Sequence, residues 1–217
     1  MATYESLKEY LGIMDESVHI EQYKGYTIKI EYDLNAMNPR KEFDNMGTMV
    51  TWKRGYTLGD KQPRMDKYDY FAEVIRGSTA GNGRMYNSYW YPLYECSSGS
   101  DVRLRVGEWM EPYDDSQIGW IYVSKADVRK EYGIKHVKEN HKLLVQRVLK
   151  GEVEEYNAYL SGEVYGWTVV GWSGEDPNYM FDSVWGYYDY DYCLSDAKIC
   201  VDYLVRKNGE AEVPNEA

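Results

Sequence analysis

Three short segments each place a carboxylate beside a small polar side chain and shortly before a glycine. They are Asp44-Asn45-Met46-Gly47, Asp115-Ser116-Gln117-Ile118-Gly119 and Asp182-Ser183-Val184-Trp185-Gly186. Asp, Asn, Ser and Gly favour turns, because their short side chains bond nearby backbone and Gly tolerates positive φ. If the three turns end equivalent hairpins, the three carboxylates could converge on one sheet edge. There they could bind a cation or a basic group, or form a solvated rim.

One chemistry for such a site is metal-dependent hydrolysis by Asp44, Asp115 and Asp182, since two-metal sites use clustered carboxylates. The sequence offers no His ligand at suitable spacing, no Gly-x-Ser-x-Gly and no His-Glu-x-x-His. We therefore assign no catalytic residue and no metal ligand, and we expect no cofactor.

A second chemistry is the binding of a nucleotide or another small molecule in a pocket at the same turns. Asn38-Pro39 is expected to hold Arg40 next to Asp44, and Arg suits bidentate phosphate recognition. Aromatic rings could stack on a base. The candidate ligand-binding residues are Arg40, Asp44, Asn45, Asp115, Ser116, Asp182, Ser183, Trp120 and Trp185.

Charge is distributed very unevenly along the chain, whose formal net charge is −11. Residues 125–150 contain eight Lys or Arg, whereas residues 151–197 contain ten Asp or Glu and neither Lys nor Arg. Such a stretch makes a strong local field. It fits either a partner protein with a basic surface or intramolecular docking on the preceding basic helix. The candidate partner-binding residues are Glu152, Glu154, Glu155, Glu175, Asp176, Asp189 and Asp191.

Composition sets the outer limits of the interpretation. Of the 217 residues, 43% are hydrophobic, which predicts a globular domain over residues 1–207 and a flexible acidic tail over 208–217. We expect no membrane span, no secretory signal and no direct binding of nucleic acid. Three cysteines without paired spacing favour a reducing cytoplasm. The 24 Tyr residues suit half-buried sheet faces or a recognition surface.

Alternation and capping signals predict the elements that would position these residues. The expected strands are Tyr26–Tyr32, Thr48–Trp52, Trp90–Cys96, Val102–Val106, Trp120–Val123, Tyr165–Trp172 and Trp185–Tyr190. Pro92 argues against a central position for its strand unless a bulge is present. The expected helices are Tyr4–Leu11, Asp66–Arg76, a basic helix beginning after Ser124, Val153–Leu160 and Leu194–Val205.

These elements predict an α+β fold. We expect one antiparallel sheet built from three diverged strand–turn–strand–helix units, with the helices on one face. The units would cover about residues 20–77, 85–132 and 163–206, and a helical insertion would cover 134–161.

The three turn segments, together with Asn38-Pro39-Arg40 and the continuation Trp120-Ile121-Tyr122-Val123-Ser124, carry a family resemblance. Over residues 26–205 the chain resembles an uncharacterised family of bacteriophage and mobile-element proteins. The resemblance implies a phage context, in which accessory proteins of this size often act on host machinery, and it implies no particular activity.

These observations favour a phage-encoded, non-enzymatic binding protein in the cytoplasm of the bacterial host. It would inhibit or redirect a host factor through an acidic surface, in anti-defence of the anti-CRISPR or anti-restriction type. One version is mimicry of nucleic acid, in which spaced carboxylates occupy a basic groove. The alternatives are the small-molecule binding protein and the metal-dependent hydrolase described above.

Overall fold

The computed structural model describes residues 17–53, 55, 57–77, 88–98, 101–108, 117–174, 176 and 178–211. The expected helix Tyr4–Leu11, the residues Asp115, Ser116 and Glu175, and most of the expected tail lie outside these ranges. Contacts divide the chain into two compact units. Unit 1 comprises Met1–Ala36 and Gly162–Ala217, and unit 2 comprises Met37–Ser161. We predicted a single domain over residues 1–207. Whether the two units form one domain is not tested, so this stays a prediction.

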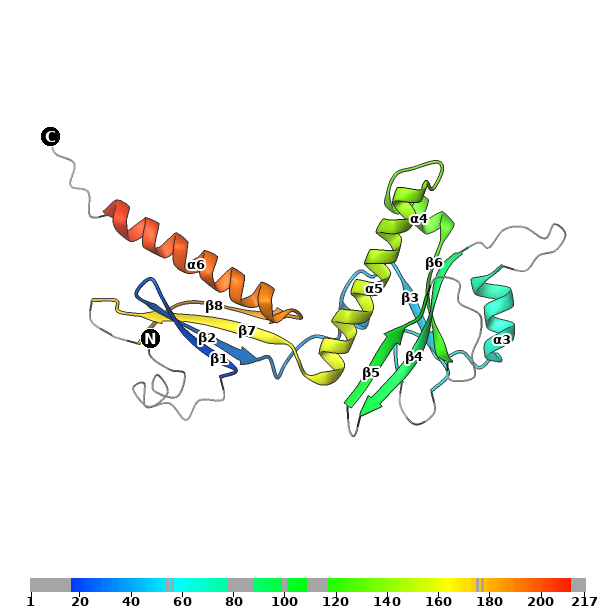
Figure 1. The fold of residues 1–217 in the computed structure, drawn as a ribbon, viewed down its shortest axis with the longest axis horizontal. Coiled ribbons are helices and arrows are strands. Elements are labelled where there is room, and N and C mark those ends of the chain that lie inside the picture. The colour runs from blue at the N-terminus through cyan, green and yellow to red at the C-terminus, as the bar shows by residue number, and fades with distance from the viewer. Residues whose placement is uncertain are drawn as a thin grey trace. The chain divides into compact units, whose positions relative to one another are not determined.

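Unit 1 is a four-stranded antiparallel sheet covered on one face by a long helix (Figure 1). Its elements are β1 (His19–Tyr23), β2 (Tyr26–Tyr32), β7 (Tyr165–Gly171), β8 (Tyr179–Tyr187) and α6 (Tyr190–Ala211), with strand order β1-β2-β7-β8. Lys24 and Gly25 join β1 to β2 with φ values of 48° and 85°. Positive φ at both central residues matches the twist of a tight hairpin.

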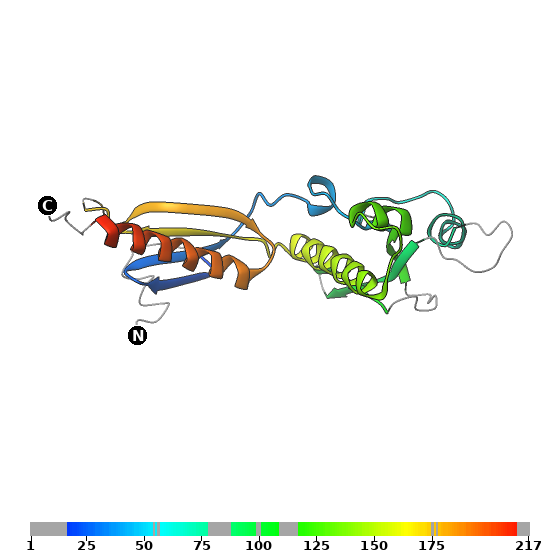
Figure 2. The same ribbon diagram turned by 90° about the horizontal axis from the view of Figure 1, so that it is seen from above.

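The core of unit 1 lies between α6 and the two central strands. Cys193, Ala197 and Val201 recur every four residues, so they form one buried helix face. They pack with a cluster that includes Ile28 and Trp167. In the view from above, β8 lies beside α6 rather than beneath it for most of its length (Figure 2). The outer strand β8 is therefore the least covered part of this sheet.

Unit 2 is a second four-stranded antiparallel sheet, of order β3-β6-β4-β5. Its strands are β3 (Thr48–Thr51), β4 (Ser88–Ser98), β5 (Asp101–Val106) and β6 (Gln117–Ser124). Its helical elements are α2 (Pro39–Glu42), α3 (Lys67–Tyr70), the π-helical turn η1 (Phe71–Ile75), α4 (Lys125–Glu131) and α5 (Glu139–Ser161). One of the two sheets is curved into a half-barrel.

Both faces of the unit 2 sheet carry a hydrophobic core. On one face Met49 and Ile121 pack with Val145 and Leu149 of α5. On the other face Trp120 belongs to a second cluster with residues of α3 and η1. The reason is visible in β6, where apolar side chains occupy both alternating sets of positions instead of one.

The α+β class is confirmed, and most of the expected strands are present. The expectation of a single sheet is wrong, because the described strands form two sheets, and in unit 2 helices cover both faces. Pro92 does lie in a strand with neighbours on both sides. Its pairing with β6 is followed by a register shift at Leu93/Tyr94, and Gly107 N–H donates to its carbonyl at 2.8 Å. The bulge exception therefore applies.

The third predicted turn is also wrong. Asp182 to Gly186 lie inside β8, paired with β7. Gly186 has a φ of 90°, but the register shifts beside it, between Tyr165 and Gly166, so its unusual backbone falls at a bulge instead of a turn. The described residues include no helix that is both long and apolar enough to cross a membrane.

Candidate functional site

Local sequence positions Arg40 at the start of unit 2. The side-chain carbonyl of Asn38 accepts a 2.9 Å hydrogen bond from the Arg40 backbone N–H and caps α2, whose first residue is Pro39. The Asn45 side chain donates to the carbonyls of Pro39 and Phe43 at 2.7 and 2.8 Å. Asn38 and Asn45 thus fix the backbone on both sides of Arg40.

The Arg40 guanidinium is fully hydrogen-bonded inside the protein. Nε and Nη2 bind the two oxygens of Asp60 at 2.9 and 2.5 Å, which is the bidentate geometry of a strong ion pair. Nη1 donates to Asn45 Oδ1 at 2.7 Å and to Glu152 Oε2 at 2.8 Å. Nη2 also donates to the Gly47 carbonyl at 2.7 Å. All five N–H donors of the guanidinium therefore have partners.

Glu152 joins this cluster from the middle of α5. Its Oε1 accepts the Met46 N–H at 2.7 Å, and both its oxygens lie 3.1 Å from the Gly47 nitrogen. Gly47 permits the approach, because a Cβ there would lie 2.5 Å from Leu149 Cδ2 and 2.9 Å from Glu152 Oε2. We call Arg40, Asn45, Gly47, Asp60 and Glu152 the Arg40 cluster.

The charged side chains of the Arg40 cluster are largely buried, and this burial shifts their pKa values. Only 1% of the Arg40 side chain and 9% of the Glu152 side chain are exposed. Burial lowers the pKa of the Arg40 guanidinium, but Asp60 and Glu152 raise that pKa, and the net shift is upward. The neighbouring Glu155 is exposed at the surface, but its carboxyl group is partly desolvated, and this desolvation and the charge of Glu152 raise its pKa. Through these ion pairs and hydrogen bonds, the cluster holds the segment before β3 and the loop that contains Asp60 against α5.

Sequence reasoning expected Arg40 beside Asp44 and did not find its two carboxylate partners. The five donors of Arg40 go to the residues named above, and Asp44 is exposed. Asp60 lies 20 positions away and Glu152 lies 112 positions away. No local signal in the sequence connects Arg40 with Asp60 or Glu152.

The remaining candidates for a ligand pocket are divided between the two units. Asp44, Asn45 and Trp120 belong to unit 2, whereas Asp182, Ser183 and Trp185 belong to β8 of unit 1. Trp120 is buried, with Phe71 stacked on it at 4.9 Å and Trp52 packed edge-on at 5.7 Å. Among the described candidates, Arg40 Nη1 donates to Asn45 Oδ1 at 2.7 Å, and the Ser183 N–H donates to Asp182 Oδ1 at 2.8 Å.

The residues of β8 form a different kind of surface. Strand alternation sends successive side chains to opposite faces. Asp182 Oδ2 lies 3.9 Å from Cys200 Sγ of α6, so Asp182 faces the helix. Trp185 lies on the other face, over Gly166, where a Cβ would come within 2.1 Å of the indole ring. Trp185 is 47% exposed and Met180 is 57% exposed.

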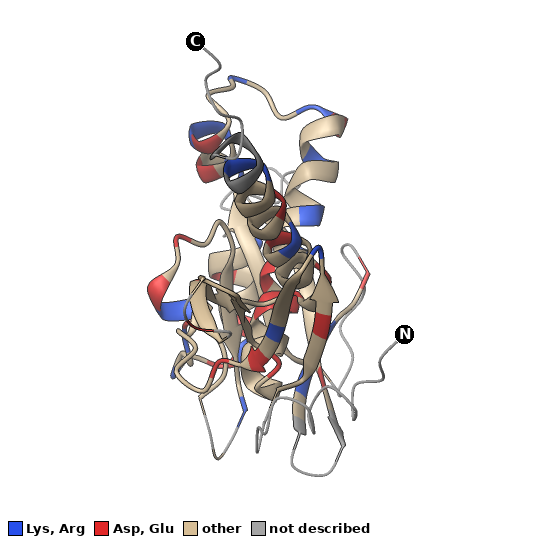
Figure 3. Cartoon of the chain, turned by 90° about the vertical axis from the view of Figure 1, so that its left-hand side faces the viewer, with Lys and Arg blue, Asp and Glu red and all other residues tan. Residues whose placement is uncertain are grey.

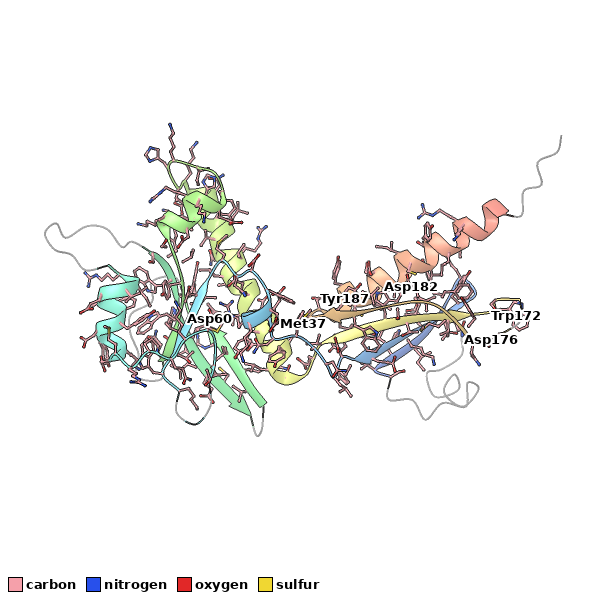
Figure 4. The ribbon with its side chains drawn as sticks, turned by 180° about the vertical axis from the view of Figure 1, so that it is seen from behind. Met37, Asp60, Trp172, Asp176, Asp182 and Tyr187 are labelled. Atoms are coloured by element: carbon pink, nitrogen blue, oxygen red, sulfur yellow. The ribbon has the colours of Figure 1, made fainter. Side chains whose placement is uncertain are left out.

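The exposed carboxylates of unit 1 lie along β8 and at its ends. Asp176 precedes the strand and Asp182 is in its middle (Figure 4). Asp189 and Asp191 follow the strand at the start of α6. Asp189 Oδ1 accepts the Tyr192 N–H at 2.7 Å and caps α6, while Asp176 accepts the Asn178 N–H at 2.8 Å. These two acids therefore have local structural roles in addition to their charge.

A partly buried polar contact anchors the end of β8 to α6. The Tyr187 hydroxyl donates to Asp196 Oδ2 at 2.5 Å, and Trp167 Nε1 lies 3.1 Å from the same oxygen. Burial and the bond to Asp196 raise the pKa of Tyr187 to about 12. Burial also raises the pKa of Cys193 to about 12 and that of Cys200 to about 11. Both thiols are therefore protonated at neutral pH, which disfavours a nucleophilic role.

The other acidic candidates lie on α5. Glu154 and Glu155 are exposed, whereas Glu152 is committed to the Arg40 cluster. Within the described residues, no group of three or more His, Cys, Asp or Glu could hold a metal ion. A site built from the three predicted turns also needs Asp115, which lies outside those residues, so that site stays a prediction.

Comparison of the chain with protein-family models, with curated proteins and with solved structures found no match.

Proposed function

We propose that this chain is a phage-encoded, non-enzymatic binding protein that engages a basic host protein through the acidic surface of unit 1. The observation that carries the proposal is the one-sided charge of β7, β8 and the first turns of α6. No Lys or Arg occurs between residues 162 and 197. The exposed acids Asp176, Asp182, Asp189 and Asp191 therefore have no cation near them in the sequence.

The one-sided charge belongs to this region and not to unit 1 as a whole. Figure 3 shows Lys and Arg as well as Asp and Glu on the unit that faces the viewer. The cations of unit 1 with ion-pair partners lie elsewhere: Lys24 binds Asp202 at 2.7 Å and Lys198 binds Glu21 at 3.0 Å. Opposite charge on a partner would steer association and set its orientation.

Apolar exposure accompanies the charge, which suits a protein partner better than a solvated rim. Trp185, Met180 and Trp172 are largely exposed on or beside β8. Aromatic side chains and Met are enriched at protein interfaces, where they supply contact area that charge alone cannot. The buried Arg40 cluster of unit 2 has no comparable exposure, so we place the partner on unit 1.

The proposal is tested by a pull-down of the tagged chain from host lysate, washed first at low and then at high salt. We expect one stoichiometric host protein that the high-salt wash removes. The triple variant Asp182→Asn, Asp189→Asn and Asp191→Asn should fail to retain it. Asn remains a good N-cap, so Asp189→Asn keeps the start of α6 intact.

The matched control removes the same number of charges from unit 2, by Glu73→Gln, Glu131→Gln and Glu139→Gln. These three acids are exposed, and the control should retain the host protein as the unmodified chain does. Equal loss of the partner by both triple variants would show that only net charge matters and would refute the assigned surface. An empty pull-down with the unmodified chain would refute the proposal itself.

A further inference from the structure

We propose that β8 binds its partner by strand addition, with an extended segment that alternates basic and apolar residues placed between the β8 edge and the exposed stripe of α6. This inference rests on the proposed function and specifies how the acidic surface recognises its partner. It needs three features: an open sheet edge, an apolar wall beside it, and charge that selects the occupant.

The edge is supplied by β8. Within the described strands it pairs with β7 on one side and has no neighbour on the other. An outer strand presents a row of backbone N–H and C=O groups that can template another strand. Between its two bulges, residues Asp182 to Trp185 pair regularly with β7. The Ser183 N–H in this part donates to Asp182 Oδ1 at 2.8 Å.

The wall is supplied by α6. Tyr192, Ile199 and Tyr203 are 7 and 4 residues apart, so they form one stripe on the helix. They are exposed, Ile199 to 60%. Tyr192 stacks obliquely on Tyr187 at the end of β8, with ring centroids 5.7 Å apart. Cys200, next to Ile199, lies 3.9 Å from Asp182. The Tyr192 end of the stripe therefore lies beside the end of β8.

A strand added to β8 would meet different groups on its two faces. On the helix side it would meet Asp182 and Val184, so its basic side chains belong on this side. On the other side it would meet Met180 and Trp185, which suit apolar side chains. Alternate side chains of the added strand would thus lie in different surroundings, which is how strand addition gains specificity.

Charge identifies the occupant as a basic segment. Asp176, Asp182 and Asp191 are spread from one end of β8 to the other, and basic side chains on the added strand would face them. A second copy of this chain fits less well, because two antiparallel β8 edges would bring Asp182 of one copy close to the same acidic edge of the other. Like charges directly opposite destabilise strand pairs.

The test uses the full chain and a fluorescent nine-residue peptide of alternating Lys and Val, which matches the length of β8. We expect binding by fluorescence anisotropy and, in hydrogen exchange, new protection of β8 amides with β3 amides unchanged. A peptide of alternating Glu and Val should not bind. Two further Lys–Val peptides carry N-methyl groups on one or the other alternate set of amides. Because only one set faces β8, one of them should bind about tenfold more weakly.

A matched pair of neutral substitutions tests the wall. Ile199→Gln removes the centre of the α6 stripe, and Leu143→Gln makes the same kind of change on α5, where Leu143 is 59% exposed. We expect Ile199→Gln to weaken binding of the Lys–Val peptide severalfold and Leu143→Gln to leave it unchanged. Circular dichroism of both variants confirms that the fold is kept.

The outcomes separate this inference from the proposed function. If the Lys–Val peptide binds, but both N-methylated forms bind equally well and β8 gains no protection, strand addition is wrong and the acidic surface stands. If the peptide fails to bind while the pull-down retains a host protein, the extended occupant is likewise wrong. If neither peptide nor host protein binds, both proposals fail. Concentration-dependent dimerisation that protects β8 without peptide and is lost in Ile199→Gln would make a second copy the occupant and overturn the stated partner.

Discussion

The Arg40 cluster of unit 2 and the β8 edge of unit 1 use the same chemical groups in opposite ways. In the cluster, two carboxylates and one guanidinium are buried, and every donor of the guanidinium is bound. At the edge, carboxylates of the same acidic stretch are exposed, and they face solvent beside apolar side chains. Burial decides which role a carboxylate takes. A buried charge must be paired within the protein, whereas water solvates an exposed charge, which is then available to bind another molecule.

The comparison shows that a run of acidic residues is not one functional unit. Glu152 and Asp182 lie in the same stretch without Lys or Arg, and nothing in the sequence distinguishes the role of one carboxylate from that of the other. The fold places Glu152 in unit 2 as a structural ion-pair partner and Asp182 on the outer strand of unit 1. Four predictions test this contrast, in order of decreasing effect.

The largest effect is expected for Arg40→Ala. This substitution leaves Asp60 and Glu152 as uncompensated charges, and breaking a buried ion pair in this way costs about 3–5 kcal/mol of unfolding free energy. Urea denaturation measures the change. The exposed Arg147→Ala is the control and should stay within about 0.5 kcal/mol. A loss below about 1 kcal/mol for Arg40→Ala would place the cluster among ordinary surface ion pairs.

The next effect separates two acids on the same helix. Glu152→Gln keeps the shape of the side chain but removes the charge that binds Arg40, so we expect a loss of about 1–3 kcal/mol. Glu154→Gln changes an exposed acid two positions later and should have an effect within about 0.5 kcal/mol. Both values come from urea denaturation at pH 7. Equal losses of unfolding free energy for the two variants would contradict the assignment of different roles to the buried Glu152 and the exposed Glu154.

A smaller effect is expected where β8 is anchored to α6. Tyr187→Phe removes the hydroxyl that donates to Asp196, at a cost of about 1 kcal/mol at neutral pH. The pKa of Tyr187 is raised from 10.0 to about 12, so above pH 10 the unfolded state ionises first. The advantage of the unmodified protein over Tyr187→Phe should therefore shrink between pH 10 and 12. A difference that stays constant across this range would contradict the assigned hydrogen bond, and the exposed Tyr203→Phe serves as the reference.

The smallest effect concerns Glu155, beside the Arg40 cluster. Its pKa is raised by partial desolvation of the carboxyl group and by the charge of Glu152, so its ionised form weakens the folded state above the ordinary Glu value of about 4.3. Glu155→Gln should raise the melting temperature slightly at pH 7, and the gain should disappear as the pH falls below that value. A gain that persists or grows in acid would show that the carboxyl is not destabilised by its surroundings.

Local signals determined much of this protein. Alternation predicted β2 and β5, and the cap Ser124 was readable, because each depends on residues a few positions apart. The position of Arg40 at the end of a restrained Asn-Pro segment was readable for the same reason. The sequence also showed where negative charge accumulates.

Only the tertiary structure decided what these residues contact. In the sheet of unit 1, β7 pairs with β2, although the whole sequence of unit 2 separates these two strands in the chain. It also joins Arg40 to Glu152 across 112 positions and turns the predicted third turn into an edge strand. Alternation specifies which face of a strand is apolar. It does not specify which other strand or helix that face packs against, because several apolar faces of the chain could pack there. The choice among them is made by the packing of the whole chain, which no short segment contains.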